Sequence, residues 1–457
     1  MMTSCWTLLP IRLCAKRRNK MGSYIPVSDA ERRAMLDAIG AVTVDELFEA
    51  IPPQMRVDKL DLPDGCSELE TRRFMEGIAR ENHCFGSIFR GAGAYWHYIP
   101  AIVNSVVNKE EFVTAYTPYQ AEISQGVLQA IFEYQTMIAD LTGMDVANAS
   151  VYDGAAAAAE ATNMCRDRKR NKALVAAGTH PMVIQTIRTY CFGNNSQVEI
   201  IPAKDGKLDM AALETMLDDT VSCVYLQQPN YFGIIEDAVN VGGKAHAAGA
   251  KFIMGVNPIA AAVLQSAGEC GADIAVGEGQ PLGMPLSFGG PYLGFMAASS
   301  SMMRKLPGRI VGQTVDVDGK RAFVLTLQAR EQHIRREKAS SNICSNQNLC
   351  ALTASVYLAA MGNEGLRQVA ENCYANAHYL AEKLADIGFK QAYDAHFFHE
   401  FVTESPLPAD KVMAALESHD ILGGLPLADG RILWCATEMN DKEQIDRLID
   451  VLREVAR

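Results

Sequence analysis

Apolar residues follow two periods along this chain, one typical of helices and one typical of buried strands. Residues 124–141 keep the helical period, and Gly143 stands where such a helix would end. From there to about residue 298, short apolar runs alternate with helical stretches. The predicted strands are NASVY, ALVAAG, VEIIPA, CVYLQQP, KFIMGV, ADIAVG and YLGFMAA, and the predicted helices are residues 154–170, PMVIQTIRTY, MAALETML and AVNVGGKAHAAG. This alternation predicts an α/β fold with a large, mostly parallel sheet covered on both faces.

The N-terminal part is typical of an arm of short helices, which we place at residues 21–90. Helical signals lie in SDAERRAMLDAIG, DELFEAI and ELETRRFMEGIARENH, with the breakers IPPQMR and LPDG between them. Residues 1–20 contain no acidic residue, so they fit either an organelle transit segment or a start-site extension without function. Because Met21 opens ordinary sequence, we favour the extension and expect it to be disordered.

The alternation ends near residue 330, where long helices take over. Expected elements are helices at 348–361 and 365–387, short strands around 397–401 and 432–436, and a closing amphipathic helix at 442–455. We interpret this part as a smaller C-terminal α+β domain over residues 331–457. The large domain then spans residues 91–330.

Composition narrows the classes of function. The chain has 54 acidic and 42 basic side chains and a net charge of −12. This balance argues against a general nucleic-acid surface, because such a surface needs clustered lysine and arginine. No stretch approaches the roughly 18 apolar residues of a membrane-spanning helix. The 12 cysteines include no C-x-x-C pair, which is typical of buried thiols in a reducing cytoplasm. We expect a cytoplasmic protein whose partners are small molecules and proteins, with neither nucleic acid nor membrane among them.

The segment FRGAGAYWHYIP is the first candidate for a binding loop. Its aromatic and imidazole groups, which include Tyr95 and His97, fit neither helix nor strand periodicity. The G-x-G it contains is a weak dinucleotide signal, since no strand precedes it. We favour a binding loop over a piece of core here.

A second candidate, TAYTPYQAEISQG, precedes the helix at residues 124–141. It holds Tyr116, Tyr119, Gln120 and Glu122. Taken singly, each of these polar side chains is more often a cap or turn residue than a catalyst.

The third candidate, Tyr152, Asp153 and Gly154, opens the alanine-rich helix of NASVYDGAAAAAEA. Backbone N–H groups at such a helix start can cradle an anion, although alanines also simply allow tight packing on a sheet. His396 and His399 in HFFHE stand three apart without the H-E-x-x-H order, so we expect no metal site there.

Several long strings in this sequence resemble one enzyme family in order and over nearly the whole chain. They are GAGAYWHYIP, TAYTPYQAEISQGVLQAIFEYQTMIADLTGM, NASVYDGA, GADIAVGEGQPLG, SFGGPYLGF, REQHIRREKASSNIC and WCATEMNDKEQID. Together they look like the alpha subunits (subunit 1) of two-subunit glycine decarboxylases, the P-proteins of the glycine cleavage system. The resemblance implies the fold of fold-type I pyridoxal-phosphate enzymes, with a large cofactor-type domain and a smaller C-terminal one.

Two positions test whether the chain could carry that chemistry alone. A pyridoxal enzyme holds its cofactor through a lysine imine, normally in the segment after the strand ADIAVG. In this sequence Gln280 and Pro281 stand there, and no lysine occurs between Lys251 and Lys305. Where such enzymes usually carry an acid for the pyridine nitrogen, at the end of KFIMGV, this chain has Asn257.

The resemblance therefore implies a subunit that is inactive alone. It implies that pyridoxal phosphate lies in the partner beta subunit, that the substrate is glycine, and that the aminomethyl group passes to the lipoyl arm of the H-protein. The residues expected to line the substrate pocket or subunit interface are Tyr95, His97, Tyr116, Tyr119, Gln120 and Glu122. Those of a vestigial cofactor pocket are Tyr152, Asp153, Gly154 and Asn257.

Two alternatives stay open at this point. One is a self-sufficient pyridoxal-phosphate decarboxylase or aminotransferase that uses an unusual lysine such as Lys320 or Lys338. The other is a non-catalytic regulatory relative, for which the loop around Tyr95 would be irrelevant to turnover.

Overall fold

The computed structural model describes residues 27–57, 61–62, 65–339, 341 and 343–455. The chain forms two compact units, Met1–Cys84 and Phe85–Arg457. The extension expected at residues 1–20 lies outside the described residues, so its disorder stays a prediction.

The described part of the first unit consists of short helices. Helices α1 (Asp29–Ile39) and α2 (Glu68–Ala79) both begin with a capping box, in which a serine and a glutamate three residues later exchange hydrogen bonds. The predicted helix DELFEAI is only a 3₁₀ turn, Val44–Phe48, because two prolines follow directly. A further 3₁₀ turn is Pro53–Met55. None of the described residues of this unit is buried.

A seven-stranded sheet forms the centre of the second unit. Its strand order is β2 (Val146–Ala147), β10 (Gly294–Ala298), β9 (Ile274–Glu278), β8 (Lys251–Val256), β7 (Val221–Gln228), β3 (Lys172–Ala176) and β4 (Gln197–Ile201). The strands from β4 to β9 run parallel, β10 is antiparallel to β9, and β2 is antiparallel to β10. The prediction of a mostly parallel sheet is confirmed.

The register aligns apolar side chains across this sheet. Val175 pairs with Tyr225, Tyr225 with Ile253, and Ile253 with Ile274. All four are buried in one apolar cluster on one face of the sheet, together with the alanines of α6. A second, larger cluster lies on the other face.

Helices cover both faces, as the alternating pattern predicts. On one face lie α6 (Gly154–Cys165) and α7 (Pro181–Gly193), and residues of α5 (Gln125–Thr142), α8 (Met210–Met216), α9 (Ala238–Ala247) and α11 (Asn348–Asp386) belong to the other cluster. Helix α6 ends five residues before the predicted Arg170, because Arg166 has extended φ and ψ. The predicted strand NASVY is also wrong. The strand β2 precedes it, and Ser150 has a φ of 147°.

Smaller elements surround this body. They are helices α3 (Ala101–Val107) and α4 (Glu110–Val113), the strand pair β5 (Ala203–Lys204) and β6 (Lys207–Leu208), and the short helix α10 (Gln332–Arg335). The hairpin of β11 (Ile310–Val315) and β12 (Arg321–Thr326) is not predicted above. It is fastened to α5, where the Gln135 amide donates to the Val311 carbonyl at 3.0 Å.

The C-terminal elements enclose a core of their own. Strands β13 (Glu400–Thr403), β16 (Ile432–Cys435) and β15 (Leu425–Pro426) form a sheet next to α12 (Ala409–Glu417) and α13 (Lys442–Val455), with Trp434 fully buried between them. Strand β13 begins three residues after the expected position. Strand β1 (Ser87–Ile88) pairs with β14 (Ile421–Leu422), so these two residues belong to the second unit and not to the arm.

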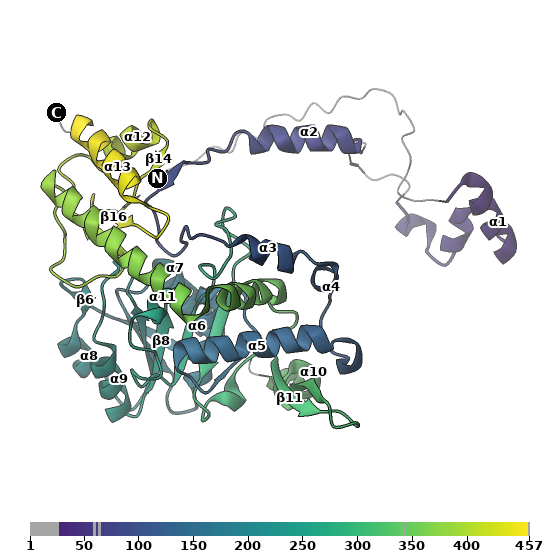
Figure 1. Ribbon diagram of the computed structural model, residues 1–457. Coiled ribbons are helices and arrows are strands. Elements are labelled where there is room, and N and C mark those ends of the chain that lie inside the picture. Colours follow the sequence, from purple (N-terminus) through teal and green to yellow (C-terminus); the bar gives the residue numbers. More distant parts are fainter. Residues whose placement is uncertain (1–26, 58–60, 63–64, 340, 342, 456–457) are drawn as a thin grey trace. The chain divides into compact units, whose positions relative to one another are not determined.

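Helix α11 connects the two cores of this unit. In Figure 1 it runs from beside α5 to the C-terminal helix α13, both of which it contacts. Ala354 and Tyr357 belong to the core at the sheet, whereas Leu380 and Leu384 belong to the C-terminal core. A kink at Gly362, with a φ of 60°, separates its two predicted halves. The division of this unit into domains at residue 330 stays an interpretation.

None of the helices among the described residues is both long enough and apolar enough to cross a membrane.

Candidate functional site

The loop at residues 91–100 is bound to the C-terminal sheet by Glu400. The Tyr95 hydroxyl donates to Glu400 Oε2 at 2.8 Å, and the Ala92 N–H donates to Glu400 Oε1 at 2.6 Å. A Cβ at Gly91 would lie only 2.5 Å from Glu400 Oε1, so this approach requires glycine. Burial raises the pKa of Glu400 to about 7. Burial and the nearby Glu400 carboxylate also hold the pKa of Tyr95 well above its ordinary value.

A second carboxylate, Glu438, holds the next residues of the loop. His97 Nδ1 lies 2.7 Å from Glu438 Oε2, and the Tyr98 N–H donates to Glu438 Oε1 at 2.8 Å. Burial would raise the pKa of Glu438, but these two contacts outweigh it and hold the pKa below its ordinary value. The His97 side chain is only 2% exposed. It therefore acts inside this chain as the partner of a buried acid.

Gln280 joins the same loop to the end of strand β9. Its side-chain carbonyl accepts from the Tyr95 N–H at 2.9 Å, and its amide donates to the Tyr95 and Met284 carbonyls at 2.9 and 2.8 Å. Gln280 is fully buried, and Pro281 after it is buried as well. The structure thus joins two of the predicted site residues, Tyr95 and Gln280, through hydrogen bonds that use every polar atom of the amide.

The expected anion cradle at the start of α6 faces an acid of the same chain. Asp153 caps the helix by accepting from the Ala156 N–H at 2.7 Å, as its sequence position suggests. The Gly154 N–H donates to Glu278 Oε2 at 2.9 Å. Tyr152, in contrast, points its ring to solvent and is 71% exposed.

Asn257 caps a turn and does not reach across the site. Its side-chain oxygen accepts from the N–H groups of Ile259 and Ala260 at 2.9 and 3.1 Å. These bonds stabilise the 3₁₀ turn Ala260–Ala262 at the carboxyl end of β8. The amide is therefore engaged by its own backbone and offers no negative charge.

The segment from Tyr116 to Glu122 lies at the surface, apart from the loop at residues 91–100. Tyr116, Gln120 and Glu122 are all exposed, with Tyr116 at 81%. Tyr119 is held in place, because the Arg309 guanidinium lies 4.9 Å from its ring centre and donates to its hydroxyl at 3.1 Å. Tyr116 and Tyr119 both expose aromatic surface.

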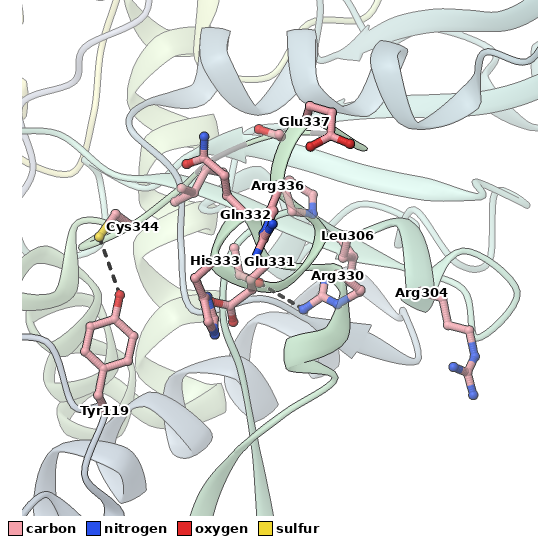
Figure 2. A pocket seen from close by; sticks show the side chains of 14 residues that line it. Tyr119, Arg304, Leu306, Arg330, Glu331, Gln332, His333, Arg336, Glu337 and Cys344 are labelled. Atoms are coloured by element: carbon pink, nitrogen blue, oxygen red, sulfur yellow. Dashed lines mark hydrogen bonds and ion pairs between the residues drawn. The ribbon is translucent and has the colours of Figure 1, made fainter. Parts of the chain in front are cut away.

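Tyr119 also lines a cavity of about 700 Å³ (Figure 2). Its hydroxyl points at the Cys344 sulfur, 3.6 Å away. This contact and the nearby Arg309 lower the pKa of Cys344. The remaining lining residues include Arg304, Arg330, His333 and Arg336, as well as Glu331 and Glu337. Such a mixed, mostly basic wall suits a polar or anionic group.

The two histidines of HFFHE are not among the described groups whose possible ligand atoms lie close together. His399 is buried, neither of its ring nitrogens has a hydrogen-bond partner, and burial lowers its pKa to about 3. His396 uses its carbonyl to accept from the Ile235 N–H. Among the described residues, His97, Cys373 and Glu438 do bring ligand atoms within 4.8 Å of one another. There the Cys373 thiol donates to Glu438 at 3.3 Å, and burial holds its pKa well above the ordinary value.

The sequence reasoning missed the three acids that organise these loops. Glu278 and Glu438 lie inside strings that carry the family resemblance, whereas Glu400 ends the histidine motif HFFHE. Each holds at least one group that is more than 120 residues away along the chain. A buried-strand context around an acid, as in IAVGEG, was the one local signal available.

Comparison with known proteins places this geometry in a family. Residues 22–452 match the family model of the glycine cleavage system P-protein. The chain belongs to the P-protein family. A relative from Desulfitobacterium hafniense, named as a probable glycine dehydrogenase (decarboxylating) subunit 1, is 47% identical over 444 residues, which cover 95% of this chain and all of the relative. The family resemblance is confirmed.

Solved structures agree with the assignment to the P-protein family. A crystal structure of glycine decarboxylase (P-protein) in inhibitor-bound form has a TM-score of 0.90 and 40% identity, and the match covers 95% of this chain and all of the other. A sphingosine-1-phosphate lyase from Burkholderia pseudomallei has a TM-score of 0.64 at 14% identity, covering 88% and 93%, so it shares only the fold. The predicted fold class, that of fold-type I pyridoxal-phosphate enzymes, is confirmed.

Proposed function

We propose that this chain is the subunit of a two-subunit glycine decarboxylase that does not carry the cofactor. The names of its relatives support an enzyme subunit that needs a second subunit. The observation that carries the proposal is Gln280, which stands in the segment for the cofactor lysine and is fully bonded to the Tyr95 backbone. A buried amide in that position neither forms an imine nor leaves space for one.

The residues of this chain do not fit pyridoxal phosphate. The segment between Lys251 and Lys305 contains no lysine, and Asn257 caps its own turn. The lysines of the rival hypothesis lie elsewhere. Lys320 follows the turn of the β11–β12 hairpin, where its side chain is 76% exposed, and Lys338 is exposed in a 3₁₀ turn. No observation favours either lysine, so we place the cofactor in the beta subunit.

With that partner, the complete enzyme decarboxylates glycine and passes the aminomethyl group to the lipoyl arm of the H-protein. The beta subunit's pyridoxal phosphate supplies the electron sink for this chemistry. For this chain we infer a surface role for the exposed Tyr116, Tyr119, Gln120 and Glu122 at the subunit interface or along the lipoyl path. Tyr95 and His97 then act as positioning residues inside the chain, since their side chains are held by Glu400 and Glu438 and fix the loop at residues 91–100. The setting is the cytoplasm.

Reconstitution tests the proposal directly. The chain is co-expressed with a beta subunit, and exchange of carbon dioxide into glycine is measured with lipoylated H-protein. We expect exchange from the pair and none from either chain alone. The double variant Lys320→Ala/Lys338→Ala serves as control and should keep full exchange. A purely regulatory relative would bind the beta subunit without enabling exchange.

Borohydride reduction of the isolated chain with pyridoxal phosphate gives a second readout that needs no activity. Peptide mapping should find no pyridoxyl-lysine formed at stoichiometric yield. One such lysine anywhere in the chain would overturn the assignment of the cofactor to the partner.

A further inference from the structure

The backbone at the start of α6 converges on one carboxylate, that of Glu278. The Gly154 N–H donates to its Oε2 at 2.9 Å, and the N–H groups of Gln280 and Leu293 donate to its Oε1 at 3.0 and 2.9 Å. The donors come from three segments, namely the first residue of α6, the turn after β9 and the residue before β10. Several N–H groups around one point at a helix N-terminus form the arrangement that proteins use to bind phosphate.

The charges around Glu278 are acidic or neutral. Those that face it are Asp153 at the helix cap, Tyr134 from α5, Tyr292 from the loop before β10, and Cys350 from α11. No ion pair between Glu278 and a lysine or arginine occurs in the described part of the chain. Backbone dipoles therefore offset part of the cost of burying this carboxylate, as they would for a bound anion, while burial still raises its pKa to about 7.

Two glycines let the segments around the carboxylate approach one another closely. A Cβ at Gly154 would lie 2.9 Å from both the Cβ and the backbone nitrogen of Glu278. A Cβ at Gly294 would lie 2.3 Å from the Asp153 carbonyl oxygen. The Glu278 side chain fills the gap that these glycines leave in front of the helix.

We propose that Glu278 is an internal substitute for a bound anion, so that its carboxylate fills the anion-binding position at α6 and excludes a phosphate group. The inference rests on the proposed function in one respect, because it explains how a subunit of this fold is stable without the phosphate of pyridoxal phosphate. The absence of the cofactor lysine does not by itself explain why a carboxylate stands at the start of α6, whereas this role of Glu278 does. Removing the side chain should convert the cradle into a phosphate site.

The test compares Glu278→Ala with Glu236→Ala at pH 8. Glu236 is the control, since its buried carboxylate also accepts a backbone N–H, that of Leu208, together with the Asn230 side-chain amide, and takes no N–H from a helix start. Melting temperatures are measured in inorganic phosphate and in sodium chloride of equal ionic strength. With phosphate at about tenfold its dissociation constant, we expect Glu278→Ala to gain about 2 °C, and the wild type and Glu236→Ala to gain less than 1 °C.

Equal phosphate responses in the two variants would overturn the proposal. If Glu278→Ala does not fold in chloride, refolding yield replaces the melting temperature as the readout. A yield that rises with phosphate but not with chloride supports the proposal, and a yield that phosphate does not raise counts against it. Because the assay uses one chain, inorganic phosphate and no beta subunit, its result is independent of the exchange assay. A pyridoxyl-lysine in the wild type would refute the proposed function without deciding the phosphate response of the variant.

Discussion

Replacing His97 by alanine should test whether the loop at residues 91–100 is held from within the chain. The side chains of His97 and Glu438 are 2% and 10% exposed, so the substitution leaves a buried carboxylate without its nearest partner. Breaking a buried pair in this way costs about 3–5 kcal/mol. The Tyr98 N–H and the Cys373 thiol still donate to Glu438, so we expect a loss of about 2–4 kcal/mol in the free energy of unfolding.

Thermal and denaturant unfolding of the isolated chain measure this loss. A fall in melting temperature of roughly 3–5 °C is expected for a unit of this size. His180→Ala is the comparison without a carboxylate, because the partly buried His180 ring bonds only the Ala92 carbonyl of the same loop and the Met182 N–H, so its loss should cost about 1 kcal/mol. The double variant His97→Ala/Glu438→Gln removes the carboxylate charge as well and should therefore lose less stability than the two single variants together. The difference, which is the coupling energy of the pair, should be about 1–3 kcal/mol.

Activity decides whether His97 has a further role. If it is a positioning residue, the exchange rate per assembled heterodimer should stay within about tenfold of the wild type. A loss of more than about 30-fold with unchanged stability would refute the reasoning and place the imidazole in the substrate pocket. A coupling energy near zero would refute the paired-charge argument itself.

Further substitutions test the remaining geometry. Burial raises the pKa of Glu278 to about 7, so ionisation of its carboxyl group opposes folding. The free energy of unfolding of the wild type should therefore fall by up to about 3 kcal/mol between pH 4.5 and 7. Urea titrations of Glu278→Gln should not show this fall. Gly91→Ala should displace Glu400 and cost about 2 kcal/mol or more by thermal unfolding, whereas equal stability would contradict the close approach. Tyr119→Phe should slow alkylation of Cys344 at pH 7 several-fold in peptide mapping, with the other exposed cysteines as internal control, and an unchanged rate would exclude the hydroxyl as the cause of its lowered pKa.

The sequence predicts the sheet well because most residues of its central strands are buried. KFIMGV and CVYLQQP are almost continuous apolar runs, and such runs need no partner to be recognised. The hairpin of β11 and β12 is different, because β11 is buried only at its start and carries polar residues beyond. The Asp318–Gly319 turn was the local signal for it. Strands of two residues such as β2 and β1 exist only through pairing and leave no pattern.

The site was predictable in its positions but not in its partners. Tyr95, His97 and Gln280 stand out by residue type in a glycine loop or a lysine segment. Their partners follow from chain topology. Glu400, more than 300 residues later, accepts a hydrogen bond from the Tyr95 hydroxyl, and Gln280 accepts one from the Tyr95 N–H. Periodicity carries no such long-range information, and burial of an acid becomes visible only in the fold.

The shared helix α11 makes the two cores of the second unit a single cooperative system. Residues on both sides of Gly362 anchor the same helix, Tyr357 in one core and Leu384 in the other. Loss of packing around Trp434 would free the C-terminal half of that helix and weaken its N-terminal half on the sheet. Two domains in the architectural sense would then melt as one thermodynamic unit, and damage far from the sheet would lower hydrogen-exchange protection in its strands.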